Sequence, residues 1–99
     1  MKPSEADVTL AALAVVAFGR VYVNQRKYLS LKLFTREEEI AQRLMNVFGG
    51  RYYAQGVGFV WALGHQRDLL LLADIVRPHR KVYDHLDLLF ELADKNPPP

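Results

Sequence analysis

The residues of this 99-residue chain best suited to chemistry are basic, aromatic and amide side chains that alternate with aliphatic ones. Arg20, Tyr22 and Asn24 alternate with Val21 and Val23, and the same spacing recurs between residues 28 and 33. Alternation with a period of two places polar side chains on one face of a strand and aliphatic side chains on the other. Because such polar side chains pair with phosphates and base edges, the pattern predicts a nucleic-acid surface.

This predicted surface draws on two hairpins and contains no acidic residue. Its members lie on the polar faces of the strands or at the tips of the connecting loops. We expect nucleic acid to be bound by Arg20, Tyr22, Asn24, Arg26, Lys27, Tyr28, Ser30, Lys32, Arg51, Tyr53 and Gln55. An ordinary solvated sheet face remains an alternative interpretation, since solvated faces also carry polar side chains.

The remaining titratable residues do not predict a metal or catalytic site. The acidic run Glu37–Glu39 falls in the first turn of a predicted helix, where carboxylates complement the helix dipole. The three histidines are dispersed, and the chain has no cysteine, which removes a thiolate zinc site, a disulfide and a cysteine nucleophile. We therefore expect neither a metal nor a cofactor.

Helices and strands must position the polar surface, and their order follows from capping and periodicity. Capping pairs with Ser4 and Thr35 as N-caps begin two helices, which end near Gly19 and at Gly49–Gly50. Proline at position 78 separates two later helices. The expected elements are a helix ending near residue 18, strands 20–24 and 28–33, a helix 35–48, strands 51–54 and 59–63, and helices 66–76 and 81–94.

This order, α-β-β-α-β-β-α-α, predicts an α+β fold with a four-stranded antiparallel sheet. We expect one domain over residues 1–95 and a disordered tail over residues 96–99, because the tail is rich in proline and has no packing motive. The net charge of +2 is too small for binding by bulk electrostatics, so a nucleic-acid site must depend on where the charges lie. We expect a cytoplasmic protein, because the start lacks a signal-peptide pattern and its apolar run is shorter than the about 20 residues that span a bilayer.

The first predicted helix is apolar all round. Between Val8 and Phe18 only Thr9 is polar, so the helix must be covered on more than one side. The sheet of the same domain would cover one side of this helix. The small side chains of the helix would let the same helix of a second subunit approach closely and cover the other side. We expect a homodimer through Leu10, Ala11, Leu13, Ala14, Ala17 and Phe18. A monomer that buries this helix entirely is the alternative.

Short segments along nearly the whole chain, from Val8 to Leu92, resemble the LAGLIDADG homing endonucleases. The end of the first helix runs straight into a strand, as the LAGLIDADG motif does, and later segments are similar to the family's second strand, helix stop, fourth strand and last helices. These segments are Ala17–Val23, Leu29–Leu33, Val47–Gly50, Phe59–Trp61, Asp68–Leu70 and Ile75–Pro78. The resemblance implies a homing-endonuclease-like saddle, in which two subunits pack through their motif helices and lay their sheets over the DNA major groove.

One departure from the family pattern decides the expected activity. In the family, an Asp or Glu directly precedes the terminal glycine of the motif and holds the metal for phosphodiester hydrolysis. Here Phe18 precedes Gly19, and aligning the front of the motif instead puts Ala17 in that place. Neither side chain can bind Mg²⁺, so we expect no enzyme activity.

The expected function is that of a non-catalytic, homodimeric duplex-DNA-binding protein, with transcriptional regulation as one role. The alternative is an RNA-binding or intron-splicing maturase-like protein, since the family includes proteins that help introns fold. A residual nuclease and a purely structural dimer are further hypotheses. Competition between duplex DNA and structured RNA at controlled salt would separate the first two.

Overall fold

The computed structural model describes residues 2–96, which form an α+β fold. The elements follow the predicted order: α1 (Glu5–Phe18), β1 (Arg20–Val23), β2 (Leu29–Thr35), α2 (Glu38–Phe48), β3 (Arg51–Gln55), β4 (Gly58–Leu63), α3 (Gln66–Val76), the 3₁₀ turn η1 (Arg77–His79) and α4 (Asp87–Lys95). The predicted class and order are confirmed. A short antiparallel hairpin follows α1 and another follows α2, as the period-two pattern indicates.

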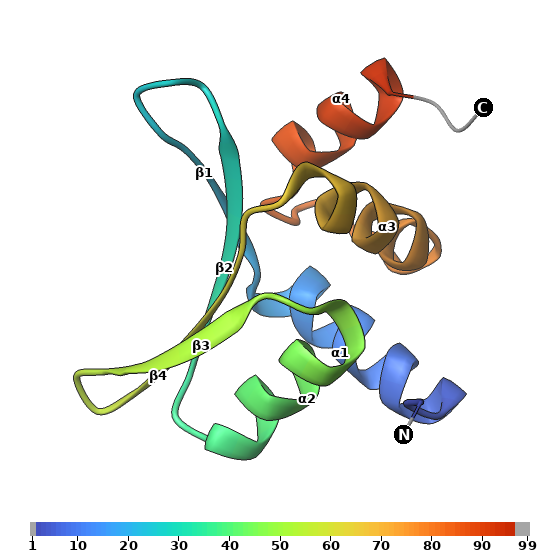
Figure 1. Cartoon of the computed structure of the whole chain (residues 1–99). Coiled ribbons are helices and arrows are strands. Elements are labelled where there is room, and N and C mark those ends of the chain that lie inside the picture. Colours follow the sequence, from blue (N-terminus) through green and yellow to red (C-terminus); the bar gives the residue numbers. More distant parts are fainter. Residues whose placement is uncertain (1, 97–99) are drawn as a thin grey trace.

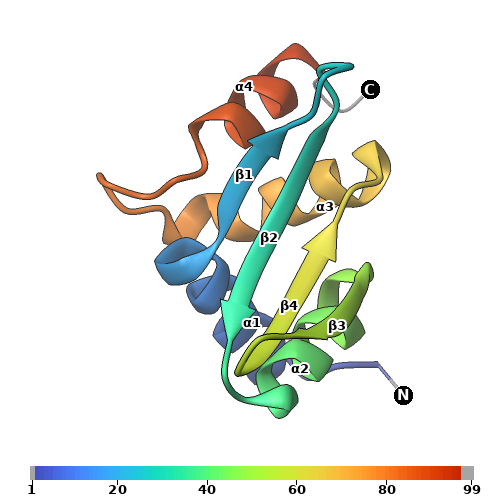
Figure 2. The same ribbon diagram turned by 90° about the vertical axis from the view of Figure 1, so that its left-hand side faces the viewer.

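The four strands form one antiparallel sheet in the order β1-β2-β4-β3. All four helices lie against one face of this sheet, and the other face is left open (Figure 1). Both hairpin ends bend toward the open side, so the open face is concave (Figure 1). In the view onto that face, β1 and β3 form its two edges (Figure 2).

The core lies between the sheet and the helices. Trp61 and Leu63 of β4 and Leu31 and Leu33 of β2 are fully or almost fully buried there. The indole Nε1 of Trp61 donates a hydrogen bond of 2.9 Å to the carbonyl oxygen of Gly49, so its polar atom is satisfied within the core. The aliphatic side chains of β2 and β4 therefore face the helices, as predicted, whereas Val23 at the end of β1, also expected in the core, is 48% exposed.

Three helix ends can be compared with the ends predicted from the sequence. The capping box of Ser4 with Asp7 is present, with each side chain accepting from the backbone of the other. The predicted box at Thr35 is wrong, because Glu37 is the N-cap of α2 and the hydroxyl of Thr35 instead accepts from the backbone N–H of Glu37. Asn96, which the sequence assigns to the tail, donates its side-chain amide to a carbonyl oxygen of α4. The rest of the predicted tail, residues 97–99, lies outside the described residues.

The last helix begins later than predicted, at Asp87 and not near residue 81. The carboxylate of Asp84 accepts hydrogen bonds from the backbone N–H groups of Lys81 and Leu86. These bonds give the backbone an alternative to a helical turn, which is how a side-chain acceptor competes with a helix. Residues 80–86 therefore form a loop.

No helix within residues 2–96 combines the length and the apolar character needed to cross a membrane.

Candidate nucleic-acid interface

Strand pairing arranges the side chains of the open face in rows that run across the sheet. Arg20 of β1 pairs with Lys32 of β2, Lys32 pairs with Ala62 of β4, and Ala62 pairs with Arg51 of β3. We call Arg20, Lys32 and Arg51 the cation row. With neighbouring strands about 4.8 Å apart, this row spans roughly 14 Å from edge to edge. The small side chain of Ala62 leaves space between Lys32 and Arg51.

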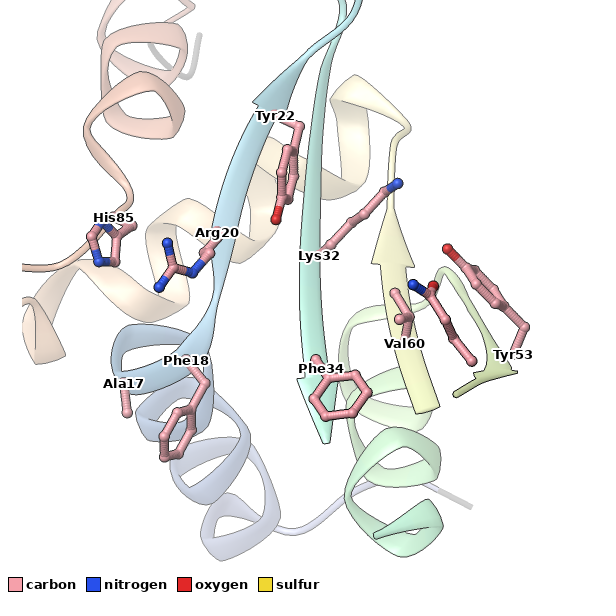
Figure 3. A pocket seen from close by; sticks show the side chains of 10 residues that line it. Ala17, Phe18, Arg20, Tyr22, Lys32, Phe34, Tyr53, Val60 and His85 are labelled. Carbon is pink, nitrogen blue, oxygen red and sulfur yellow. The ribbon is translucent and has the colours of Figure 1, made fainter. Parts of the chain in front are cut away.

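A second row is apolar and lies beside the first. Phe34, Val60 and Tyr53 occupy paired positions on β2, β4 and β3, and we call them the apolar row. Phe34 is 50% exposed. Val60 lies on the open face, as expected, but its neighbours leave it only 7% exposed (Figure 3). The ring of Phe34 lies against Gly58, where an added Cβ would come within 2.8 Å of the ring.

One member of the cation row, Lys32, lies near an aromatic ring. The ammonium of Lys32 lies 5.6 Å from the ring centroid of Tyr22, which is within the range of a cation–π interaction. Tyr22 pairs with Ser30 in the next row, so it lies one row along the sheet from Lys32.

Two hollows line the open face. One, of about 500 Å³, contains members of both rows together with the end of α1 and His85 (Figure 3). The other, of about 610 Å³, lies at the opposite end of the cation row beside Ser30, Arg51 and His65. Among the described residues, none that lines either hollow is acidic. The predicted strand members of the surface are thus brought together on one face, around two hollows without a described acidic residue in their lining.

The β1–β2 loop presents the predicted tip residues. Arg26, Lys27 and Tyr28 are exposed there, and Lys27 has a positive φ of 63° that closes the turn. Asn24 stabilises the loop, because its side-chain oxygen accepts hydrogen bonds from the backbone N–H groups of Arg26 and Tyr28 at 2.9 and 3.0 Å. Only the amide nitrogen of Asn24 is left to contact a ligand. Gln55 lies at the end of β3 and lines the first hollow.

The members of the predicted dimer surface on α1 differ in their exposure. Leu10 and Leu13 are 49% and 42% exposed, Ala17 and Phe18 are also exposed, and Ala14 is half-buried. Their spacing of three and four residues places them along one side of the helix. Ala11 is a correction, since it is 1% exposed and packs into the core of its own domain, where no partner helix can reach it.

His85 is a member of the site that the sequence did not predict. Its backbone forms an isolated bridge with Arg20, so the loop of residues 80–86 reaches the edge of β1. Figure 3 places the His85 and Arg20 side chains at that edge. Phe34 was also missed, although its parity within β2 matches Ser30 and Lys32 and could have revealed it.

An ion pair that is buried on its carboxylate side holds this loop. The guanidinium of Arg80 donates to both carboxylate oxygens of Asp84, at 3.1 and 3.0 Å, and the Asp84 side chain is 1% exposed. The hydrogen bonds from Arg80 lower the pKa of Asp84, and the same pairing raises the pKa of Arg80. The guanidinium also lies 4.0 Å from the ring centroid of Phe90 in α4. The loop is thereby tied to the last helix.

Within residues 2–96, no three His, Asp or Glu side chains come together as a possible metal site. Phe18 ends α1 with its ring exposed beside the first hollow (Figure 3).

No protein-family model matches the chain, and no curated protein is significantly similar to it. The LAGLIDADG resemblance therefore remains a prediction from the sequence.

Proposed function

We propose that this protein is a non-catalytic homodimer that binds the major groove of duplex DNA with its concave sheet. The observation that carries the proposal is the cation row, which lies on an open face that has no acidic member among the described residues lining its hollows. The chain has a net charge of only +2, so the positive charge of this face arises from where the basic residues lie and not from an excess of them.

The dimensions of the face suit a groove. The cation row spans roughly 14 Å, and the major groove of B-DNA is about 12 Å wide. Arg20 and Arg51 at the row's ends would meet phosphates on the two sides of the groove, while Lys32 on the inner strand β2 would point toward base edges. Arg26 and Lys27 at the hairpin tip would extend the contact along the backbone.

Dimerisation would join two such faces. The exposed apolar side of α1 gives the helix a surface that a second copy could cover around a two-fold axis. Two sheets side by side would form the saddle that the LAGLIDADG resemblance implies, and the bound site would be palindromic. Transcriptional regulation is one role that binding without cleavage would serve.

The absence of cleavage rests on the end of α1. Phe18 stands where the resemblance requires a metal-binding carboxylate, and Ala17 stands there in the alternative register. Neither side chain can ligate a divalent cation or activate water.

RNA binding is the second candidate, and the exposed aromatic rings favour it. Tyr22, Tyr28 and Phe34 offer planar surfaces on which unpaired bases could stack. Structured RNA that outcompetes duplex DNA for the protein at equal salt would favour this candidate over the first.

Single substitutions test the interface. Arg20→Ala, Lys32→Ala and Arg51→Ala are compared with Lys95→Ala, which removes a cation from the end of α4, in binding isotherms at several salt concentrations. A lost phosphate contact should weaken binding to all sequences and flatten the salt dependence, whereas a lost base contact should cost about 1–3 kcal/mol at one position. If all three row variants bind as tightly as the parent protein with an unchanged salt dependence, the sheet is not the binding surface.

A further inference from the structure

We infer that the apolar row reads the C5-methyl group of a pyrimidine in the major groove, thymine in unmodified DNA or 5-methylcytosine in modified DNA. This inference rests on the proposed duplex binding and adds to it a chemical preference at one position of each half-site. It follows from what lies beside the cation row on the same face of the sheet.

The two rows are close enough to act on one ligand. Lys32 and Phe34 are two residues apart on β2, so their side chains leave the same face about 6.7 Å from each other. Arg51 and Tyr53 have the same relation on β3. A duplex held by the cation row would therefore bring its base edges against the apolar row.

Two of the three members of the apolar row cannot satisfy a polar base edge. Phe34 and Val60 carry no hydrogen-bonding side-chain group, so a base amino group or carbonyl pressed against them would lose its water without gaining a partner. In the major groove, the apolar group that a base pair offers is the methyl at C5 of thymine, and aliphatic or aromatic side chains are its usual contacts. Cytosine methylated at C5 offers the same group.

The shape of the row also fits a small apolar group. Gly58 has no side chain, which lets the ring of Phe34 lie against the sheet instead of being pushed away from it. Val60 is 7% exposed at the centre, and the half-exposed ring of Phe34 and that of Tyr53 lie on either side (Figure 3). A methyl group placed over Val60 would lie in the first hollow, which all three side chains line.

The test uses four preparations of one pool of 24-base-pair duplexes with randomised sequence. Thymine is either kept or replaced by uracil, which lacks the methyl, and cytosine is either kept or replaced by 5-methylcytosine. We measure the dissociation constant of the full-length protein for each preparation at the same salt concentration. One buried methyl corresponds to about a fourfold change in affinity, and two symmetric rows to about fifteenfold.

Protein variants show whether the methyl preference arises from the apolar row. Phe34→Ala should bind the thymine and uracil pools alike, and Phe34→Leu should keep part of the preference because it restores an apolar contact. Leu71→Ala is the matched control, since Leu71 is 55% exposed but lies on α3, behind the sheet. The control should retain the parent's methyl preference.

The outcomes separate this inference from the proposed function. The inference is supported if the parent and Leu71→Ala, but not Phe34→Ala, bind the thymine pool more tightly than the uracil pool, or the 5-methylcytosine pool more tightly than the cytosine pool. The comparison that shows the difference identifies the base whose methyl group is read. Equal, salt-dependent binding of all four pools overturns the inference and leaves duplex binding standing. A methyl preference that survives in Phe34→Ala also overturns it, because the preference would then arise from duplex shape. If no pool binds, both the proposed function and this inference fail.

Discussion

Replacing Asp84 with asparagine should lower the stability of the domain by releasing the loop of residues 80–86. Asp84 accepts two hydrogen bonds from Arg80 and two from backbone N–H groups, and its side chain is 1% exposed. Asparagine keeps the shape but presents an N–H group where the carboxylate presented only acceptors. Two of the four donors then lose their acceptor, and the guanidinium keeps only the exposed carboxylate of Asp87, at 3.0 Å, as its charge complement.

The expected magnitude follows from the kind of bond that is lost. A hydrogen bond to a charged group contributes about 1.5–3 kcal/mol, so the free energy of unfolding should fall by about 2–3 kcal/mol. The Arg80 side chain is 31% exposed, which keeps the loss below that of a fully buried pair. For a domain of this length, the unfolding temperature should fall by roughly 8–24 °C.

The same pair predicts how stability changes with pH. The pKa of Asp84 is lowered in the folded protein, so between the folded value and the ordinary value near 3.9 the unfolded chain binds a proton that the folded chain does not. The stabilisation is therefore complete above about pH 4 to 5 and is lost as the pH falls through the folded pKa. Asp84→Asn should lack this part of the acid sensitivity.

Asp94→Asn is the matched control for the assay. Asp94 also pairs with an arginine, Arg77, at 3.3 Å, but the two side chains are 70% and 47% exposed. An exposed pair contributes about 0–1 kcal/mol, so this variant should unfold within a few degrees of the parent. Thermal unfolding followed by the fluorescence of Trp61 at pH 7 and at several values below pH 5 measures both variants. Equal unfolding temperatures for Asp84→Asn and Asp94→Asn would refute the role assigned to the buried pair.

Three further outcomes are expected. Leu13→Glu should leave the fold intact, because Leu13 is 42% exposed in one subunit, but should halve the mass measured by light scattering, and an unchanged dimeric mass would exclude α1 as the dimer interface. The purified protein with Mg²⁺ or Mn²⁺ should leave its bound duplex intact on a gel, whereas specific cleavage that stops on chelation would contradict the role of Phe18. Trp61→Phe should lower the free energy of unfolding by about 2–3 kcal/mol in urea, since it leaves a void and removes the donor to Gly49, and a loss below about 0.5 kcal/mol would contradict that packing.

Much of the fold was predictable because its signals are local. The alternation around Val21 and Leu31 defined the first hairpin, and the Ser4 cap defined the start of α1. The start of α4 was not predictable by periodicity, because Asp84 stops the helix through hydrogen bonds to a side chain and to backbone groups within its own loop.

The candidate site was predicted as a set of residues but not as an arrangement. Strand parity placed Arg20, Lys32 and Arg51 on one face, yet their alignment in one row depends on the pairing of β2 with β4, which are distant in sequence. The burial of Val60 depends on neighbours from β2 and β3, and the place of His85 depends on a long loop. Such non-local contacts leave little trace in a single sequence.

The dependence of DNA affinity on salt tests the central claim most directly. The parent protein and a variant that combines Arg20→Ala, Lys32→Ala and Arg51→Ala are titrated with one duplex at several salt concentrations, after their unfolding temperatures have been compared. Each phosphate contact adds about 0.9 to the slope of log affinity against log salt concentration, so the variant should bind more weakly and lose about 1.8 from the slope per subunit through the two arginines. A folded variant that keeps both the affinity and the slope of the parent would contradict binding through the concave sheet.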